Sequence, residues 1–209
     1  MRVNKFVAFL FLVLFPITSF AQDEKVRGAV ETKSGLLIVW NEPKNNFTLE
    51  VKGKDFERVP NKNIAFLVDG KFLQITSAFN RDFLAEDQRK EKLDEKAILT
   101  THGDWESNYL GQVLGENLKI DSEHIKLSNS KNALLWSFMV PKNVKGEVKK
   151  QIFLSVTKGE SVLVLNGAVT STVNEEAVRR FLLETAVTLK VSEKALSRKE
   201  AEDLALKIN

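Results

Sequence analysis

The stretch Lys149–Thr170, KKQIFLSVTKGESVLVLNGAVT, decides the fold. Its first run alternates up to Thr157, and the turn Lys158-Gly159-Glu160 leads into a second run, Ser161–Thr170. A third run, ALLWSFMV at Ala133–Val140, precedes both of them. Three β-type runs joined by short turns are typical of an antiparallel meander.

Two of these runs are apolar on both sides. In Ala133–Val140, Leu134 and Trp136 point to the face opposite Leu135, and the valines and leucines of Ser161–Thr170 alternate in the same way. A strand that is apolar on both faces must be covered on both faces. We therefore predict an α+β fold, with a mainly antiparallel sheet that carries helices on both faces (an α/β/α sandwich).

The C-terminal segment can supply covering helices. Asn174 is a good N-cap, and Glu175 and Glu176 suit a helix start. An apolar stripe at helical spacing follows it: Val178, Phe181, Leu182, Thr185 and Leu189. A last short helix is predicted from Ser197, because Ser197-x-x-Glu200 fits a capping box.

The N-terminal half predicts hairpins followed by a helical region. Gly35–Val51 is interpreted as a hairpin with one solvated face, and Ile64–Ser77 as a hairpin closed by a type I′ turn at Asp69-Gly70. The pattern then becomes helical from Arg81 to about Leu114, with Gly115 as the stop. The polar segment Glu116–Lys131 is interpreted as a loop.

The C-terminal part also resembles a known family. Lys149–Val191, KKQIFLSVTKGESVLVLNGAVTSTVNEEAVRRFLLETAVTLKV, is similar to the C-terminal part of PsbP-like domains. The shared pattern is a meander that ends in alternating Val and Leu, an acidic helix start, and a helix that closes near Thr188-Leu189. The resemblance implies an α/β/α sandwich and non-enzymatic accessory or binding roles.

The N-terminus predicts export. Residues 1–21 combine basic Arg2 and Lys5 with the apolar run Phe6–Phe15, and Ser19-Phe20-Ala21 offers small residues for cleavage between Ala21 and Gln22. The run is too short for a bilayer core of ~30 Å, and no later segment is apolar enough to cross one. We expect a signal peptide at 1–21, a flexible leader at 22–34 and a single α+β domain at 35–209. The mature protein would be periplasmic or secreted, without stable membrane insertion.

Composition excludes several classes of function. Cleavage would remove two basic residues and no acidic one, so the mature chain would be close to neutral and lacks the electrostatic signature of nucleic-acid binding. The absence of cysteine excludes thiol nucleophiles, zinc–thiolate sites and iron–sulfur clusters. The sequence has no Gly-x-Ser-x-Gly elbow, phosphate loop or dinucleotide fingerprint. No cofactor and no metal site are predicted.

The segment around His102 (THGDWES) is the main candidate site. At 100° per residue, His102 lies in the middle of an apolar helical stripe and Glu106 lies one turn further on, whereas Asp104 points away. The favoured interpretation is a core-edge histidine whose ring nitrogen is satisfied by Glu106. The alternatives are an acid–base pair in a cleft, or a metal site that would need His124 or Glu123 as a third ligand.

Two further features bear on function. Trp105 and Trp136 are candidate ligand contacts, although most tryptophans of this kind belong to the core. The charged segment Glu86–Lys96, EDQRKEKLDEK, is either a solvated helix face or a docking surface. We predict an exported non-catalytic binding or accessory protein of the cell envelope, for a protein partner or a small apolar ligand. The alternative is an exported hydrolase or isomerase that uses His102 and Glu106.

Overall fold

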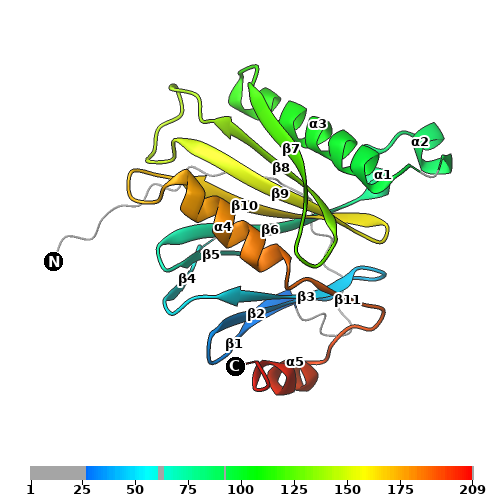
Figure 1. Ribbon diagram of the computed structural model, residues 1–209, viewed down its shortest axis with the longest axis vertical. Coiled ribbons are helices and arrows are strands. Elements are labelled where there is room, and N and C mark those ends of the chain that lie inside the picture. The colour runs from blue at the N-terminus through cyan, green and yellow to red at the C-terminus, as the bar shows by residue number, and fades with distance from the viewer. Residues whose placement is uncertain (1–26, 61–63, 92, 209) are drawn as a thin grey trace.

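The computed structural model describes residues 27–60, 64–91 and 93–208, which form two antiparallel sheets and five helices (Figure 1). The smaller sheet has the order β1-β2-β3-β11, from β1 (Arg27–Glu31), β2 (Gly35–Trp40), β3 (Asn46–Lys52) and β11 (Lys190–Ser192). The larger sheet has the order β4-β5-β6-β10-β9-β8-β7, from β4 (Phe56–Arg58), β5 (Ala65–Val68), β6 (Lys71–Phe79), β7 (Ile120–Lys126), β8 (Asn132–Met139), β9 (Lys150–Lys158) and β10 (Ser161–Val169). The helices are α1 (Asn80–Phe83), α2 (Glu86–Lys90), α3 (Glu95–Leu114), α4 (Glu175–Ala186) and α5 (Arg198–Ala205).

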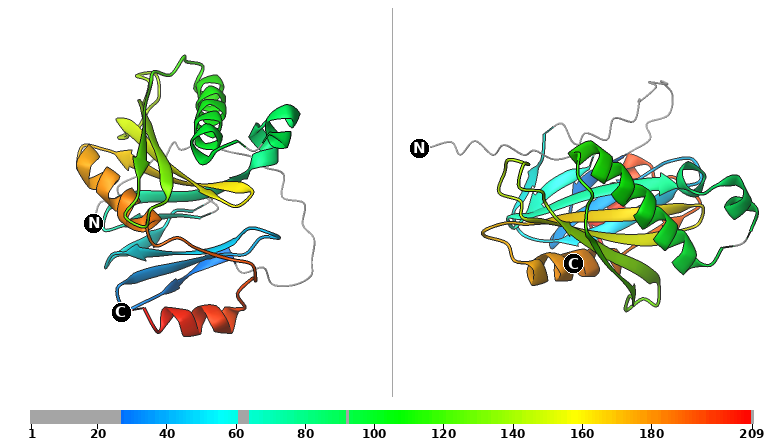
Figure 2. Two further views of the ribbon diagram at one scale, coloured as in Figure 1. Left: turned by 45° about the vertical axis from the view of Figure 1, so that its right-hand side comes forward. Right: turned by 90° about the horizontal axis from the view of Figure 1, so that it is seen from above.

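The predicted meander, β8-β9-β10, forms the centre of the larger sheet. On one face, Leu134 and Trp136 pack in a core beneath α3. On the other face, Leu135 and Leu163 belong to a core shared with α4 and the smaller sheet. The α+β fold with helices on both faces of an antiparallel sheet is therefore confirmed, and Figure 2 shows α3 and α4 on opposite sides of the strands.

The smaller sheet was not foreseen as a separate sheet. The hairpin Gly35–Val51 forms its centre, and one face of this sheet packs toward the larger sheet. The expected solvated face is wrong for β2, because Leu37 and Val39 are buried against α5. Helix α5 thus closes the outer side of the smaller sheet (Figure 1).

Two segments predicted to be irregular form strands. Arg27–Glu31, placed in the flexible leader, is β1 and pairs with β2 along the edge of the smaller sheet. Ile120–Lys126, placed in a loop, is β7 and pairs with β8 at the edge of the larger sheet. Both strands are largely exposed, so their residues lack the apolar alternation that marks a half-buried strand.

The local turn and capping signals are confirmed. Asp69 and Gly70 both have positive φ, 47° and 75°, as a type I′ turn requires. Gly115 ends α3 in the left-handed conformation at φ 66°, which glycine adopts without steric cost. Asn174 accepts a hydrogen bond from the Ala177 amide at the start of α4, and the capping box of Ser197 starts α5.

The predicted signal peptide, residues 1–21, lies outside the described residues. None of the helices that the structure describes is long and apolar enough to cross a membrane. The predicted helical region from Arg81 to Leu114 is divided into α1, α2 and α3.

Candidate functional site

His102 and Glu106 lie on α3, one turn apart. The His102 side chain is 1% exposed, and its Nε2 lies 3.4 Å from Glu106 Oε2. The contact is not aligned as a hydrogen bond, so within the described chain both His102 ring nitrogens and Glu106 Oε2 are buried without a hydrogen-bond partner. The edge of the Phe83 ring contacts the imidazole at a centroid distance of 5.0 Å. The histidine is buried, as the favoured interpretation expected, but its ring nitrogen is not satisfied by a hydrogen bond with Glu106.

Burial sets the protonation of this pair. It lowers the pKa of His102 to about 4 and raises the pKa of Glu106 to about 7, because each charged form is removed from water. Between these values both groups are neutral. Such a pair could exchange a proton, but a substrate would first have to reach a fully buried ring.

Of the two tryptophan candidates, Trp136 belongs to the interior of the fold and Trp105 does not. Trp136 is 1% exposed and stacks on Phe153 at 4.0 Å, while its Nε1 donates to Ser155 Oγ at 3.2 Å. Helix α3 covers it, so it presents no surface for a ligand. Trp105 is half-buried and lies 6.1 Å from the Phe83 ring.

The two residues considered as a third metal ligand point to different helices. His124 Nε2 lies 3.0 Å from Thr100 Oγ1 on α3. Glu123, its neighbour on β7, forms an ion pair with Arg179 on α4. Among the described residues, no three histidine or carboxylate side chains gather to hold a metal ion.

A buried lysine that the sequence did not single out lies between the sheets. Lys158, at the end of β9, is 5% exposed. Its Nζ donates to Ser161 Oγ at 2.8 Å and lies 4.7 Å over the ring of Phe47. Desolvation lowers the pKa of Lys158 to about 7, and the negative charge of Glu42 opposes that shift.

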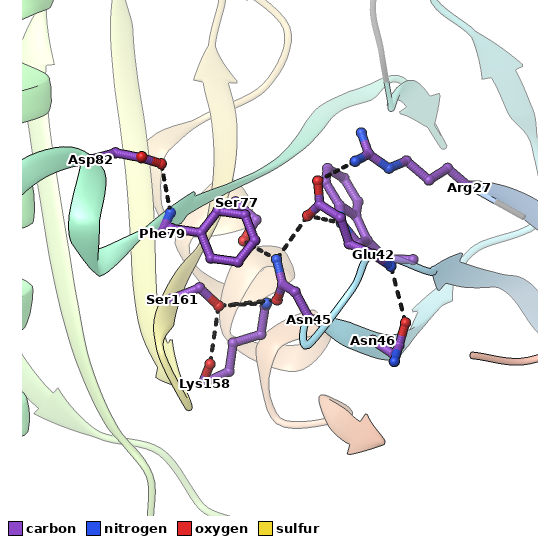
Figure 3. A network of polar contacts seen from close by, with 10 residues as sticks. Arg27, Glu42, Asn45, Asn46, Ser77, Phe79, Asp82, Lys158 and Ser161 are labelled. Atoms are coloured by element: carbon purple, nitrogen blue, oxygen red, sulfur yellow. Dashed lines mark hydrogen bonds and ion pairs between the residues drawn. The ribbon is translucent and has the colours of Figure 1, made fainter. Parts of the chain in front are cut away.

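Hydrogen bonds extend from this lysine into the smaller sheet. Ser161 Oγ is 3.0 Å from Asn45 Oδ1, to which it donates, and Asn45 Nδ2 donates to Glu42 Oε2 at 2.9 Å (Figure 3). Glu42 also accepts from Arg27 and, at 3.0 Å, from Trp40 Nε1. We call Lys158, Ser161, Asn45 and Glu42 the inter-sheet clasp, because they connect the β9–β10 turn to the β2–β3 turn.

The clasp places an amine beside a hydroxyl, which is the composition of a serine–lysine catalytic pair. Ser161, however, is 2% exposed, and its hydroxyl already bonds to Asn45 and Lys158. Its hydrogen bonds connect the larger sheet to the β2–β3 turn. The sequence showed Lys158-Gly159-Glu160 only as a turn, because Asn45 and Glu42 of the clasp lie more than a hundred residues away.

Two open clefts lie at the surface. The α4 cleft, of about 1100 Å³, lies beside α4 and the ends of both sheets. Its charged lining mixes both signs, with cations Lys33, Lys52, Lys54, Lys71 and Arg180 and acids Glu31, Asp55, Asp69 and Glu184. The α2 cleft, of about 920 Å³, lies between the β2–β3 turn and the segment of α1 and α2. None of His102, Glu106 and Lys158 lines either cleft.

The α2 cleft has a mixed lining of apolar and charged side chains. Its apolar residues are Pro43, Phe79, Leu84, Leu93 and Ile98, and its charged residues are Glu42, Lys44, Arg81, Arg89, Glu91 and Glu160. Helices α1 and α2 bury no residue of their own, and they project at one end of the molecule (Figures 1 and 2). The Arg81 guanidinium lies 4.7 Å over the Phe79 ring.

Comparison with known proteins bears on the fold alone. No protein-family model matches the chain, and no characterised protein sequence matches it. The solution structure of cyanobacterial PsbP (CyanoP) from Synechocystis sp. PCC 6803 is similar, with a TM-score of 0.50, 11% sequence identity, and coverage of 79% of this chain and 96% of that chain. The chain has a PsbP-like fold. The resemblance predicted from Lys149–Val191 is therefore confirmed for the architecture, and it extends to most of the chain.

Proposed function

We propose that this protein is an exported, non-catalytic binding or accessory protein of the cell envelope, and that the α2 cleft is its binding surface. The observation that carries the proposal is a group of apolar side chains that lines this open cleft among charged ones: Pro43, Phe79, Leu84, Leu93 and Ile98. Protein-binding surfaces commonly combine aromatic and other apolar side chains with arginine and polar groups. Helix α2 buries no residue of its own, and its Gln88 and Arg89 line the cleft.

The occupant proposed is a protein segment that places apolar side chains against Phe79 and Leu84. The lining carries three cations and three carboxylates, which favours a partner with mixed charges over a strongly charged one. Helix α2 lies in the charged segment Glu86–Lys96, so the docking surface considered from the sequence forms one wall of this cleft.

The geometry does not favour the hydrolase or isomerase alternative. Its two candidate groups, His102 and Glu106, contact each other inside the fold and line neither cleft. A cleft without these groups can bind a partner but gains no acid–base chemistry from them.

Site-specific photo-crosslinking tests the proposal, because the natural chain contains no cysteine. A benzophenone attached to Gln88→Cys would sit in the α2 cleft, and one attached to Lys199→Cys would sit on exposed α5 as the matched control. In a cell-envelope extract we expect a protein product from position 88 only, weakened by adding Arg89→Glu. The same products from both positions, or no effect of Arg89→Glu, would refute binding at this cleft.

Native mass spectrometry of the unmodified protein distinguishes a protein partner from a small apolar ligand as the occupant of the cleft. A protein partner predicts that the purified chain has its own mass alone. A retained apolar small molecule, lost from the Leu84→Glu variant, would replace the protein partner as the occupant.

A further inference from the structure

The buried polar side-chain atoms that lack a hydrogen-bond partner gather at the junction of α1 and α3. Among the described residues they are Asn80 Oδ1 on α1, and both ring nitrogens of His102 and Oε2 of Glu106 on α3. Asn80 lies three residues before Phe83, whose ring edge contacts the His102 imidazole, so both residues lie on the side of α1 that faces α3. Their burial costs free energy, because water would satisfy these atoms if the junction were open.

Helix α1 is fixed to the rest of the fold by a small set of interactions. Phe83 is partly buried against His102 and Trp105, and Leu84, directly after the helix, is buried. At the start of α1, the Asn80 amide donates to the Glu160 carbonyl oxygen at 2.9 Å, and the Phe79 amide donates to Asp82 Oδ2 at 3.1 Å. A segment with few buried apolar contacts opens at a lower cost in free energy than the core does.

Helix α1 also stands where the α2 cleft ends. Ile98 lines that cleft, and His102 and Glu106 follow it at intervals of four residues, so the three side chains lie along one side of α3. Asn80 and Leu84 line the cleft as well, whereas the Phe83 ring covers the imidazole. The cleft therefore reaches Ile98 and stops before His102.

We propose that α1 is a lid, and that lifting it extends the α2 cleft along α3 from Ile98 to His102 and Glu106. The structure described here is the closed state. In the open state, an imidazole and a carboxyl face solvent beside the Trp105 ring. Asn80 Oδ1 and Glu106 Oε2 accept hydrogen bonds, so the extension suits a partner side chain that donates them. This role in binding rests on the proposed function, whereas the lid itself does not.

Chemical modification of His102 by diethyl pyrocarbonate near neutral pH tests the lid. The only other histidine, His124, is exposed, and trypsin separates the two in peptides 97–119 and 120–126. We expect His102 to react more slowly than His124, at a rate that does not change with urea below the unfolding transition, because local opening exposes little surface. A rate that rises with urea from the lowest concentration, or no reaction of His102 in the folded protein, would overturn the proposal.

Asp82→Ala should accelerate the reaction of His102 about two- to tenfold, because the variant loses a hydrogen bond that lifting α1 breaks. Asp104→Ala removes an exposed carboxyl close to His102 on α3 and is the matched control, with no acceleration expected. Equal rates of reaction in Asp82→Ala and the natural protein would contradict the lid.

Amide hydrogen exchange of Asn80 needs no substitution. Lifting α1 breaks the hydrogen bond from the Asn80 amide to Glu160, so this amide should exchange through the same urea-independent opening. An Asn80 amide that exchanges only on global unfolding would also overturn the lid.

Crosslinking from Gln88→Cys separates the lid from the proposed function. If Asp82→Ala accelerates the reaction of His102 but leaves this crosslinking unchanged, the lid stands and only its role in binding fails. If crosslinking from position 88 is absent with and without Asp82→Ala, the proposed function fails and the lid stands.

Discussion

Replacing Glu106 by glutamine should change how stability depends on pH. In the folded protein the pKa of Glu106 is raised from its ordinary 4.5 to about 7 by burial. Its contribution to stability is therefore fully present below pH 4.5 and is lost as the pH rises through 7. A difference of 2.5 pKa units, at ~1.36 kcal/mol per unit, limits this loss to about 3 kcal/mol.

His102 contributes with the opposite sign. Its pKa is lowered from 6.5 to about 4, so its contribution is present above pH 6.5 and is lost as the pH falls through 4. In the natural protein the two contributions oppose each other between pH 4 and 7, which flattens the pH profile. Glu106→Gln leaves only the His102 contribution, so the variant should gain stability as the pH rises from 4 to 6.5.

Urea unfolding of the protein and the variant at pH 4.5 to 8, followed by circular dichroism, measures the difference. We expect Glu106→Gln to match the natural protein at pH 4.5 and to be more stable at pH 8 by up to about 3 kcal/mol. Asp104→Asn removes an exposed carboxyl from the same helix and is the matched control. A difference between Glu106→Gln and the natural protein that is constant across this pH range would refute the reasoning.

Three further predictions concern the clasp, the packing and the export of the chain. Ser161→Ala should lower the free energy of unfolding by about 1–3 kcal/mol in urea titrations at pH 8, because its buried hydrogen-bond partners lose their contact. Gly167→Ala should cost about 1–3 kcal/mol, because the new Cβ would lie 2.5 Å from Val178 Cγ1, and no such loss is expected for Gly28→Ala, which has open space around it. N-terminal sequencing of the protein recovered from its host should begin at Gln22, and a chain that begins at Met1 would contradict cleavage.

Local signals predicted those elements whose pattern is independent of distant residues. The Asp69-Gly70 turn, the Asn174 cap and the two-faced strands β8 and β10 follow from neighbouring residues alone. The edge strands β1 and β7 were missed, because an exposed strand needs no apolar side chains and is defined by its pairing with a neighbour. Helix α5 was recognisable from its capping box. Its position on the smaller sheet was not, because that position is defined by contacts with strands far away in the sequence.

The prediction of the candidate sites from the sequence was limited in the same way. His102 and Glu106 are one helical turn apart, so their contact was predictable from spacing. The clasp was not, because Lys158 and Asn45 come from hairpins in different sheets, and each looks like an ordinary turn residue in the sequence. The α2 cleft likewise combines residues from the β2–β3 turn, β6 and three helices. In the sequence, only the charged segment Glu86–Lys96 indicated a binding surface in this region.

The pairing of β11 with β3 has a consequence for the order in which the protein folds. Lys190 pairs with Thr48, and β10 pairs with β6, so both sheets are completed by residues made late in synthesis. Contacts between residues so far apart in sequence form slowly, since a long loop must close before they contribute stability. Until then, the edges of β3 and β6 stay unpaired, and unpaired edges invite association with other chains. A nascent chain of this protein therefore has a long interval in which it depends on being kept apart from its neighbours.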